Sequence, residues 1–230
     1  MSDTQIRRWH IFPDKAELVA ALRSLLLQEA AIAIEKKGRF NIVLAGGETP
    51  SALYHTLIDA KTEWDAWHIY FGDERSLPQG DQQRNDQMAK TAWLNHVPIP
   101  SQQIYNILAE LGAEEGAKQY HERLNKTEKF DLVLLGLGED GHTASLFPSG
   151  EVIYETENTL AVANAPKPPP ERVSLTAQRL SQTNKLFFIV TGSNKQNAVQ
   201  CWRNEEPIQA SQIRPEAGVD IFLDSPAATW

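Results

Sequence analysis

The chain contains 230 residues, 41% of them hydrophobic, and its 30 acidic and 22 basic side chains give a formal net charge of −8. A chain of this size can bury a large core, and its negative charge argues against a nucleic-acid-binding protein, which needs a basic surface. The single cysteine, Cys201, excludes an intramolecular disulfide bond, and no side-chain spacing typical of a metal site occurs. Since neither a signal peptide nor a membrane-length apolar run is recognisable, we expect a cytoplasmic protein that contacts no membrane.

Strand-like and helix-like segments alternate from end to end. In chain order we predict strand 8–12, helix 14–37, strand 40–45, a helix beginning at Thr49, strand 67–71, helices 85–95 and 113–126, strands 130–135, 159–163 and 172–176, helix 177–182, strand 186–191, helix 193–203 and strand 219–223. This alternation predicts one α/β domain, residues 1–230, with a mostly parallel, Rossmann-like sheet and helices on both faces.

In sheets of this kind, ligands bind beyond the carboxyl ends of the strands, where this chain has several unusual residues. Gly46 and Gly47 follow the strand at 40–45, and glycines let a ligand approach the backbone closely. Thr49 then precedes Pro50, a pattern typical of a helix N-cap, and a helix N-terminus suits a phosphate group. An ordinary strand-to-helix turn explains this motif equally well.

The strand at 67–71 is followed by three charged residues, Asp73, Glu74 and Arg75. A guanidinium group can neutralise a phosphate or carboxylate through paired hydrogen bonds, and Asp73 could orient a catalytic group. A solvated loop is the alternative interpretation of such a charged turn.

The most informative motif is GLGEDGH at 136–142, directly after the predicted strand at 130–135. Its glycines fit the GxGxxG pattern of dinucleotide-binding proteins, but a Pro-containing break follows within ten residues and the expected later acidic residue is missing, so we reject that interpretation. His142 ends the turn, and a neutral imidazole is an available general base near neutral pH. Because no GxSxG motif occurs, Ser145 is expected to pack or hydrogen-bond and not to act as a nucleophile.

Two further cations, Arg172 and Lys195, lie beside predicted strand ends. Singly, each is explained as a surface charge. Together with Arg75 they could supply the positive charge that a phosphate dianion needs in a protein of net negative charge.

Five motifs, taken in chain order, resemble the 6-phosphogluconolactonase family: LAGGETP (44–50), GDER (72–75), DLVLLGLGEDGHTASLFP (131–148), KPPPERVSLT (167–176) and TGSNK (191–195). The resemblance covers essentially the whole chain. It implies a three-layer αβα sandwich of the sugar-phosphate isomerase type and hydrolysis of 6-phospho-D-glucono-1,5-lactone to 6-phospho-D-gluconate in the oxidative pentose phosphate pathway. The partner is then a small phosphorylated sugar lactone, with no metal and no organic cofactor.

The same resemblance implies roles for individual residues. His142 is the base that activates water against the lactone carbonyl, and Asp73 orients or tunes the site. Cations and donors hold the phosphate or stabilise the oxyanion, two roles that the resemblance does not apportion: Gly46, Gly47, Thr49, Arg75, Arg172 and Lys195.

The chain departs from the family pattern at Glu48, where Ser is common, and at Arg84, which precedes Asn85 where Ser-Asn is usual. We interpret Arg84 as a compensation for the negative charge of Glu48. Two alternative functions stay open, a glucosamine-6-phosphate deaminase-like enzyme and a non-catalytic sugar-phosphate sensor. The deaminase motif resembles GHIAFNEP, which differs from the GHTASLFP of residues 141–148.

Overall fold

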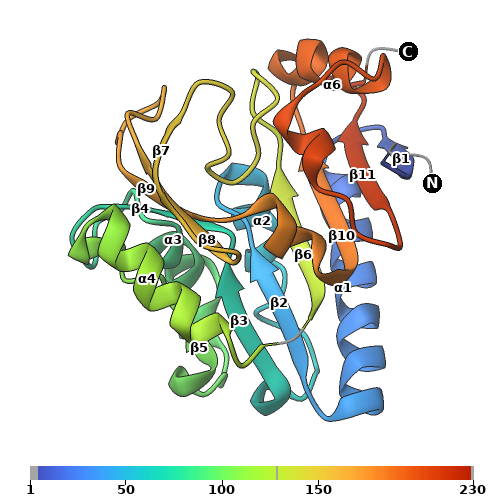
Figure 1. Ribbon diagram of the computed structural model, residues 1–230. Helices are drawn as coiled ribbons and strands as arrows, with labels where there is room; N and C mark the ends of the chain where they lie inside the picture. Colours follow the sequence, from blue (N-terminus) through green and yellow to red (C-terminus); the bar gives the residue numbers. More distant parts are fainter. Residues whose placement is uncertain (1–4, 128, 229–230) are drawn as a thin grey trace.

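The structure, a computed structural model, describes residues 5–127 and 129–228, which form two sheets and surrounding helices (Figure 1). The larger sheet contains β1 (Arg7–Phe12), β2 (Phe40–Leu44), β3 (Trp67–Phe71), β5 (Ile104–Tyr105), β6 (Phe130–Gly136), β10 (Thr183–Val190) and β11 (Val219–Asp224). The smaller sheet contains β4 (Asp73–Arg75), β7 (Glu151–Glu155), β8 (Thr159–Ala163) and β9 (Arg172–Leu175). The α-helices are α1 (Lys15–Lys37), α2 (Glu48–His55), α3 (Asn85–Ala92), α4 (Ala113–Leu124), α5 (Ala177–Ser181) and α6 (Gln196–Arg203).

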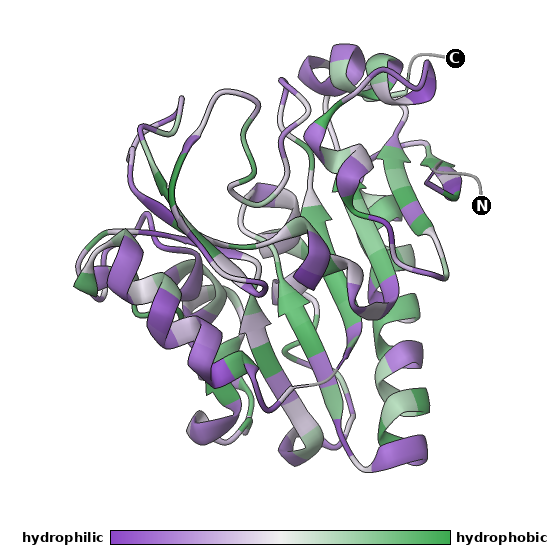
Figure 2. Cartoon of the chain, viewed as in Figure 1, coloured by the Kyte–Doolittle hydropathy of each residue, from purple (hydrophilic) through white to green (hydrophobic). Residues whose placement is uncertain are grey.

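The larger sheet has the strand order β1-β11-β10-β6-β2-β3-β5, and its strand pairs are parallel. Every residue of Phe40–Leu44 is buried, as expected for a central strand covered on both faces. Figure 2 shows that apolar residues concentrate in these strands, while α4 carries polar residues on its outer surface. The predicted mostly parallel sheet flanked by helices is therefore confirmed.

Helix α1 illustrates how local sequence signals set the ends of an element. The Asp14 carboxylate accepts hydrogen bonds from two backbone N–H groups of the first turn, and Gly38 ends the helix in a left-handed conformation with φ of 71°. The helix then packs against β1, β2, β6 and β11, whereas α4 lies at the other side of the molecule against β7, β8 and β9 (Figure 1).

The smaller sheet differs from the prediction. Strands β8 and β9 were expected to join the parallel sheet, but they pair antiparallel in the order β4-β9-β8-β7. The physical reason lies in the connection between them, residues 164–171. A parallel pair needs a crossover of a dozen residues or more, and this Pro-rich segment is too short for one.

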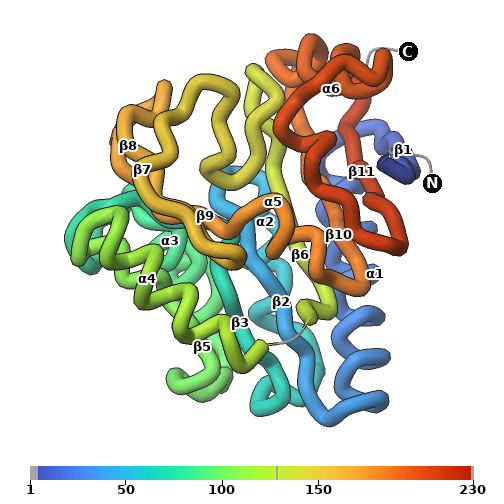
Figure 3. Tube along the Cα trace, viewed as in Figure 1, coloured from blue at the N-terminus to red at the C-terminus, as the bar shows by residue number. Residues whose placement is uncertain are grey.

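The two ends of the described chain meet at one edge of the larger sheet. Strand β1 pairs in parallel with β11, and Figure 3 shows the two segments side by side below α6.

None of the helices in the described part of the chain combines the length and apolar character needed to cross a lipid bilayer. All strands of the larger sheet point the same way, so the loops after β2, β3, β6 and β10 gather at a common edge.

Candidate active site

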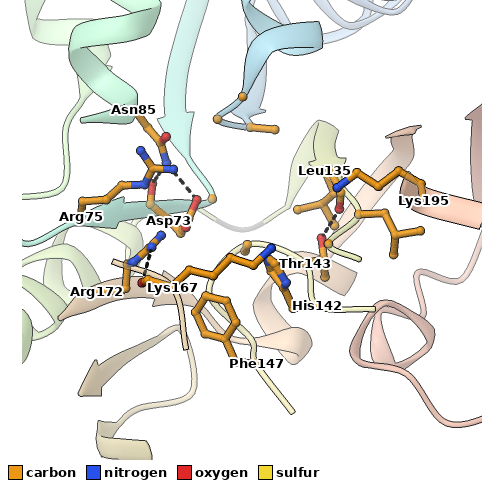
Figure 4. A pocket seen from close by; sticks show the side chains of 18 of the residues that line it. Asp73, Arg75, Asn85, Leu135, His142, Thr143, Phe147, Lys167, Arg172 and Lys195 are labelled. Atoms are coloured by element: carbon orange, nitrogen blue, oxygen red, sulfur yellow. Dashed lines mark hydrogen bonds between the residues drawn. The ribbon is translucent and has the colours of Figure 1, made fainter. Parts of the chain in front are cut away.

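A cleft lies at this common edge, between the loops of the parallel strands and the smaller sheet (Figure 4). Its volume is about 310 Å³, at the lower end of the range for small-molecule sites. The charged and amide side chains that line it are Asp73, Arg75, Asn85, His142, Lys167, Arg172 and Lys195. The cleft therefore brings together five of the predicted residues with side chains that carry charge or titrate, from motifs far apart in the sequence.

The glycine motif after β2 forms one border of the cleft. Gly46 and Gly47 both line it. A Cβ on Gly46 would lie 2.1 Å from Asn85 Oδ1, and Gly47 has φ of 109°, so both positions require glycine. Helix α2 begins at Glu48 with Gly47 as its N-cap, two residues before the predicted N-cap Thr49, because the glycine adopts the backbone conformation that starts the turn.

Thr49 does not have its predicted place. It is neither the N-cap of α2 nor one of the residues that line the cleft. Its hydroxyl lies 2.7 Å from the hydroxyl of Thr191, at the end of β10. This contact ties the start of α2 to the turn that leads to Lys195.

His142 is held by a tight turn after β6. The backbone N–H of Gly138 donates to the His142 carbonyl at 2.8 Å, and a Cβ on Gly138 would come within 1.9 Å of His142 Nδ1. The segment after β6 forms turns and irregular backbone up to β7, whereas a dinucleotide-binding glycine loop opens a helix. The imidazole packs on the ring of Phe147, with 4.5 Å between the ring centroids, and only 16% of its side chain is exposed.

Asp140 fixes the orientation of this imidazole by a short hydrogen bond between its Oδ1 and His142 Nδ1. Although burial opposes it, the interaction with His142 lowers the pKa of Asp140, so the carboxylate is ionised and accepts a hydrogen bond from Nδ1–H of His142. Burial lowers the pKa of His142 below its ordinary value of 6.5, and Asp140 only partly offsets that effect. The ring is therefore neutral at pH 7, with Nε2 unprotonated.

Asp73 is buried and held from two sides. Asn85 Nδ2 donates to its carboxylate at 3.0 Å and to its carbonyl at 2.9 Å, and Ser145 Oγ donates to the other carboxylate oxygen at 2.6 Å. Ser145 is 1% exposed, so it positions Asp73 by a hydrogen bond. These contacts leave the Asp73 carboxylate in one orientation at the wall of the cleft.

Arg75 lies beside Asp73 on β4, and its guanidinium donates to the carbonyl of Gln83. Its buried Nε has no acceptor among the residues that the structure describes. A ligand oxygen could take that place, since buried donors are rarely left unpaired. The neighbouring Glu74 carboxylate accepts from the backbone N–H groups of Arg75, Asn85 and Asp86, which ties β4 to the start of α3.

Lys167 belongs to the connection between β8 and β9, and Arg172 is the first residue of β9. Arg172 is opposite Arg75 in the β4–β9 ladder and is 6% exposed. Lys167 is an exposed residue whose side chain extends across the cleft toward His142 (Figure 4). At the other end, Lys195 reaches the cleft from the short helical turn η5 (Ser193–Lys195), and burial, reinforced by the charge of Lys167 but opposed by Glu139, lowers the pKa of Lys195.

The two departures from the family pattern have separate explanations. Glu48 is exposed and is not one of the lining residues of the cleft. Arg84 does not compensate for it, because the Arg84 side chain is 1% exposed and donates to Asp86, Glu110 and two backbone carbonyls. The interpretation of Arg84 as a partner of Glu48 is therefore wrong, and its charge serves the packing of the 76–86 segment.

Three residues were not among the predicted ligands or catalytic groups: Asn85 and Lys167, which line the cleft, and Asp140, which orients His142. Asp140 is within the GEDGH motif, and its spacing of two residues from His142 was a usable signal. Lys167 and Asn85 give no such signal, because their positions depend on how β9 and α3 pack.

No group of three His, Cys, Asp or Glu side chains that could hold a metal ion was found in the described ranges.

The fold and the cleft define a class of protein. It is an α/β protein that presents a cationic ligand site over the carboxyl ends of parallel strands, with a neutral histidine in that site. Anionic ligands of sugar size fit such a cleft, because its cations can offset a negative charge without a metal.

The comparisons with known proteins place the chain within this class. Residues 13–222 match the family model of glucosamine-6-phosphate isomerases/6-phosphogluconolactonase, and the chain belongs to this family. It is 34% identical to the 6-phosphogluconolactonase of Homo sapiens over 235 residues, covering 95% of this chain and 91% of that one. It is 36% identical to the enzyme of the same name from Mycobacterium tuberculosis over 204 residues, which cover 82% and 83% of the two chains.

Solved structures agree with this assignment. The crystal structure of 6-phosphogluconolactonase from Thermotoga maritima superposes with a TM-score of 0.88 at 26% identity and covers 96% of this chain and 100% of that chain. The three-layer α/β sandwich expected from the sequence is therefore confirmed.

Proposed function

We propose that this protein hydrolyses 6-phospho-D-glucono-1,5-lactone to 6-phospho-D-gluconate in the oxidative pentose phosphate pathway. The observation that carries the proposal is the convergence of a neutral, oriented His142 with four cations in one cleft. The family includes two reactions, and the curated relatives compared above, at 34% and 36% identity, are named as lactonases. No deaminase-type GHIAFNEP sequence stands at residues 141–148.

The chemistry needs a base and a cationic environment. Nε2 of His142 removes a proton from water as the water oxygen forms a bond to the lactone carbonyl carbon, and the carbonyl electron pair moves onto oxygen. The tetrahedral intermediate then collapses, the bond from C1 to the ring oxygen breaks, and the ring oxygen takes the proton from the imidazolium. Asp140 stabilises that imidazolium through Nδ1, and the nearby cations stabilise the oxyanion.

We assign the phosphate to the end of the cleft formed by Lys195 and the start of α2. The hydrogen bond between Thr49 and Thr191 supports this assignment, since it brings the helix N-terminus next to the turn that carries Lys195. A helix N-terminus and an ammonium group together suit a dianion. Arg75 and Asp73 then face the sugar ring and the carbonyl end.

We further infer that the whole chain acts as one domain, because one hydrophobic cluster includes residues of both sheets, such as Phe40, Ala161 and Val173. The cytoplasmic location and the absence of nucleic-acid binding stay predictions.

The decisive experiment measures release of 6-phospho-D-gluconate from the freshly prepared lactone. Because δ-lactones open unaided, the rate is compared with the spontaneous rate in the same buffer. We expect hydrolysis that rises in proportion to enzyme concentration. A rate equal to the spontaneous one, with tight binding of the product, would instead identify a sugar-phosphate sensor, and ammonia release from glucosamine 6-phosphate would identify a deaminase.

A further inference from the structure

Two cations line the cleft from this region, Lys167 in the connection between β8 and β9 and Arg172 at the start of β9, and the structure gives them different surroundings. Arg172 has a buried side chain, whereas Lys167 is exposed and extends across the cleft toward His142 (Figure 4). Both line the cleft, so the question is which of them acts on the substrate.

The guanidinium of Arg172 donates mainly to the backbone of the preceding connection. Its Nε donates to the Pro169 carbonyl at 2.9 Å, and its Nη2 donates to the carbonyls of Lys167 at 3.0 Å and Pro168 at 3.1 Å. Three successive carbonyls thus converge on one side chain, which fixes the path of the backbone from which Lys167 projects. Its carbon Cζ also lies 5.7 Å from the ring centroid of Phe147, the ring on which His142 packs.

The ammonium group of Lys167, by contrast, faces the reacting centre. Its charge contributes to lowering the pKa of both His142 and Lys195, which places it within electrostatic reach of the proposed base and of Lys195. A flexible side chain gains such a position only if its backbone is fixed, and the hydrogen bonds of Arg172 provide that constraint.

We propose that Lys167 is the cation that the β8–β9 connection presents to the lactone, and that Arg172 is a positioning residue that acts through Lys167. The inference rests on the proposed lactonase function and refines it, because it replaces Arg172 by Lys167 among the groups that contact the substrate. The planar guanidinium of Arg172 is needed to donate to all three carbonyls at once, so a positive charge at residue 172 is not enough by itself to hold the connection in place.

The test compares Lys167→Met, Arg172→Lys and the double variant in the lactone assay. Loss of one charged contact to the substrate should lower kcat/KM of Lys167→Met about 10- to 100-fold. Arg172→Lys keeps the positive charge, but its kcat/KM should be lowered by nearly as much. The kcat/KM of the double variant should be no more than about threefold below that of Lys167→Met, because the effects of two residues are not additive when one acts through the other.

A second readout separates this role from general damage to the fold. Asp140, Asp73 and Lys167 are the charged groups that act on His142, and Lys167 is the cation among these three. Removing Lys167 should therefore raise the pKa of His142 and move the acid limb of kcat/KM to higher pH, and Arg172→Lys should move it in the same direction. The control is Lys36→Met, an exposed lysine at the far end of α1, which should leave both the rate and the acid limb unchanged.

Clear results would overturn the proposal. Wild-type kcat/KM in Lys167→Met would exclude its role, and this variant changes an exposed side chain, so it should fold normally. Wild-type kcat/KM in Arg172→Lys would show that the hydrogen bonds of the guanidinium to the three carbonyls are not needed, and effects that multiply in the double variant would mean that Arg172 acts on the substrate independently of Lys167. If the wild type itself showed no hydrolysis, the proposed function would fail, and calorimetric binding of 6-phospho-D-gluconate to the same variants would still decide between Lys167 and Arg172.

Discussion

The cleft has two walls of different construction. We call the loops after β2, β6 and β10 the parallel wall, which provides Gly46, Gly47, His142 and Lys195. We call the smaller sheet with its β8–β9 connection the antiparallel wall, which provides Asp73, Arg75, Lys167 and Arg172. On the parallel wall His142 is held within its own turn, by Gly138 and Asp140, whereas on the antiparallel wall Asp73 is held by side chains distant in the sequence, Asn85 and Ser145.

This difference indicates that the two walls have different roles. The parallel wall carries the proposed base and the proposed phosphate site, which need exact placement and gain it from strand ends and tight glycine turns. The antiparallel wall lines the cleft with cations whose positions depend on packing between elements. Substitutions on the first wall should therefore change the chemistry directly, and substitutions behind the second should act through stability or geometry.

The largest effect is expected at the parallel wall. His142→Ala removes the proposed base and should lower kcat by about 10²- to 10⁴-fold, with KM nearly unchanged because the phosphate contacts stay in place. Steady-state kinetics corrected for spontaneous hydrolysis measure it. The matched control is His96→Ala, an exposed histidine that contacts the Thr91 carbonyl, which should leave kcat unchanged. Wild-type turnover in His142→Ala would exclude this residue as the base.

The next effect tests the support of the antiparallel wall. Arg84→Met should lower the free energy of unfolding by about 3–5 kcal/mol, because it leaves Asp86 and the partly buried Glu110 carboxylate without their cation. Urea unfolding followed by fluorescence measures the change. Lys90→Met, which removes a more exposed partner of the same Asp86, should cost at most about 1 kcal/mol. Equal losses in the two variants would show that burial of Arg84 does not matter.

The sequence predicted the parallel wall well, for physical reasons. A short continuous apolar run such as 40–45 is typical of a buried parallel strand. The residues that follow parallel strands lie at the same edge of the sheet. Glycines after a strand indicate tight turns, and the structure shows why glycine is needed there: Gly47 has a positive φ, and a Cβ on Gly138 would clash with His142. His142 could therefore be placed near Lys195 before any coordinates.

The same reasoning found Asp73, Arg75 and Arg172 of the antiparallel wall but not the sheet that holds them. Strand β4 has only three residues, and the largely exposed β7 (EVIYE) lacks alternating apolar and polar residues, so neither was predicted. The short segment 164–171 was a signal for antiparallel pairing that was not used. The buried partners of Arg84 and the hydroxyl contact of Thr49 cannot be inferred from spacing, because both depend on elements that meet only in the folded chain.

A smaller effect is expected at the phosphate end of the parallel wall. Lys195→Ala should raise KM about 10- to 100-fold and lower kcat much less, since the phosphate does not react and is bound equally in the ground and transition states. The control is Lys185→Ala, near the opposite end of β10 and not among the residues of the cleft. A loss confined to kcat would move Lys195 to the oxyanion and leave the phosphate for the antiparallel wall.

The smallest effect concerns Glu48, the residue that departs from the family pattern. It stands at the start of α2, next to the proposed phosphate site, yet its side chain is exposed and does not line the cleft. An exposed charge is screened by water and salt, so Glu48→Ser should change kcat/KM by less than about threefold, with any change toward a lower KM. Kinetics at low and at physiological ionic strength measure it. A tenfold fall in KM would show that Glu48 opposes phosphate binding directly, and that the helix start contributes more to the site than the backbone contacts alone require.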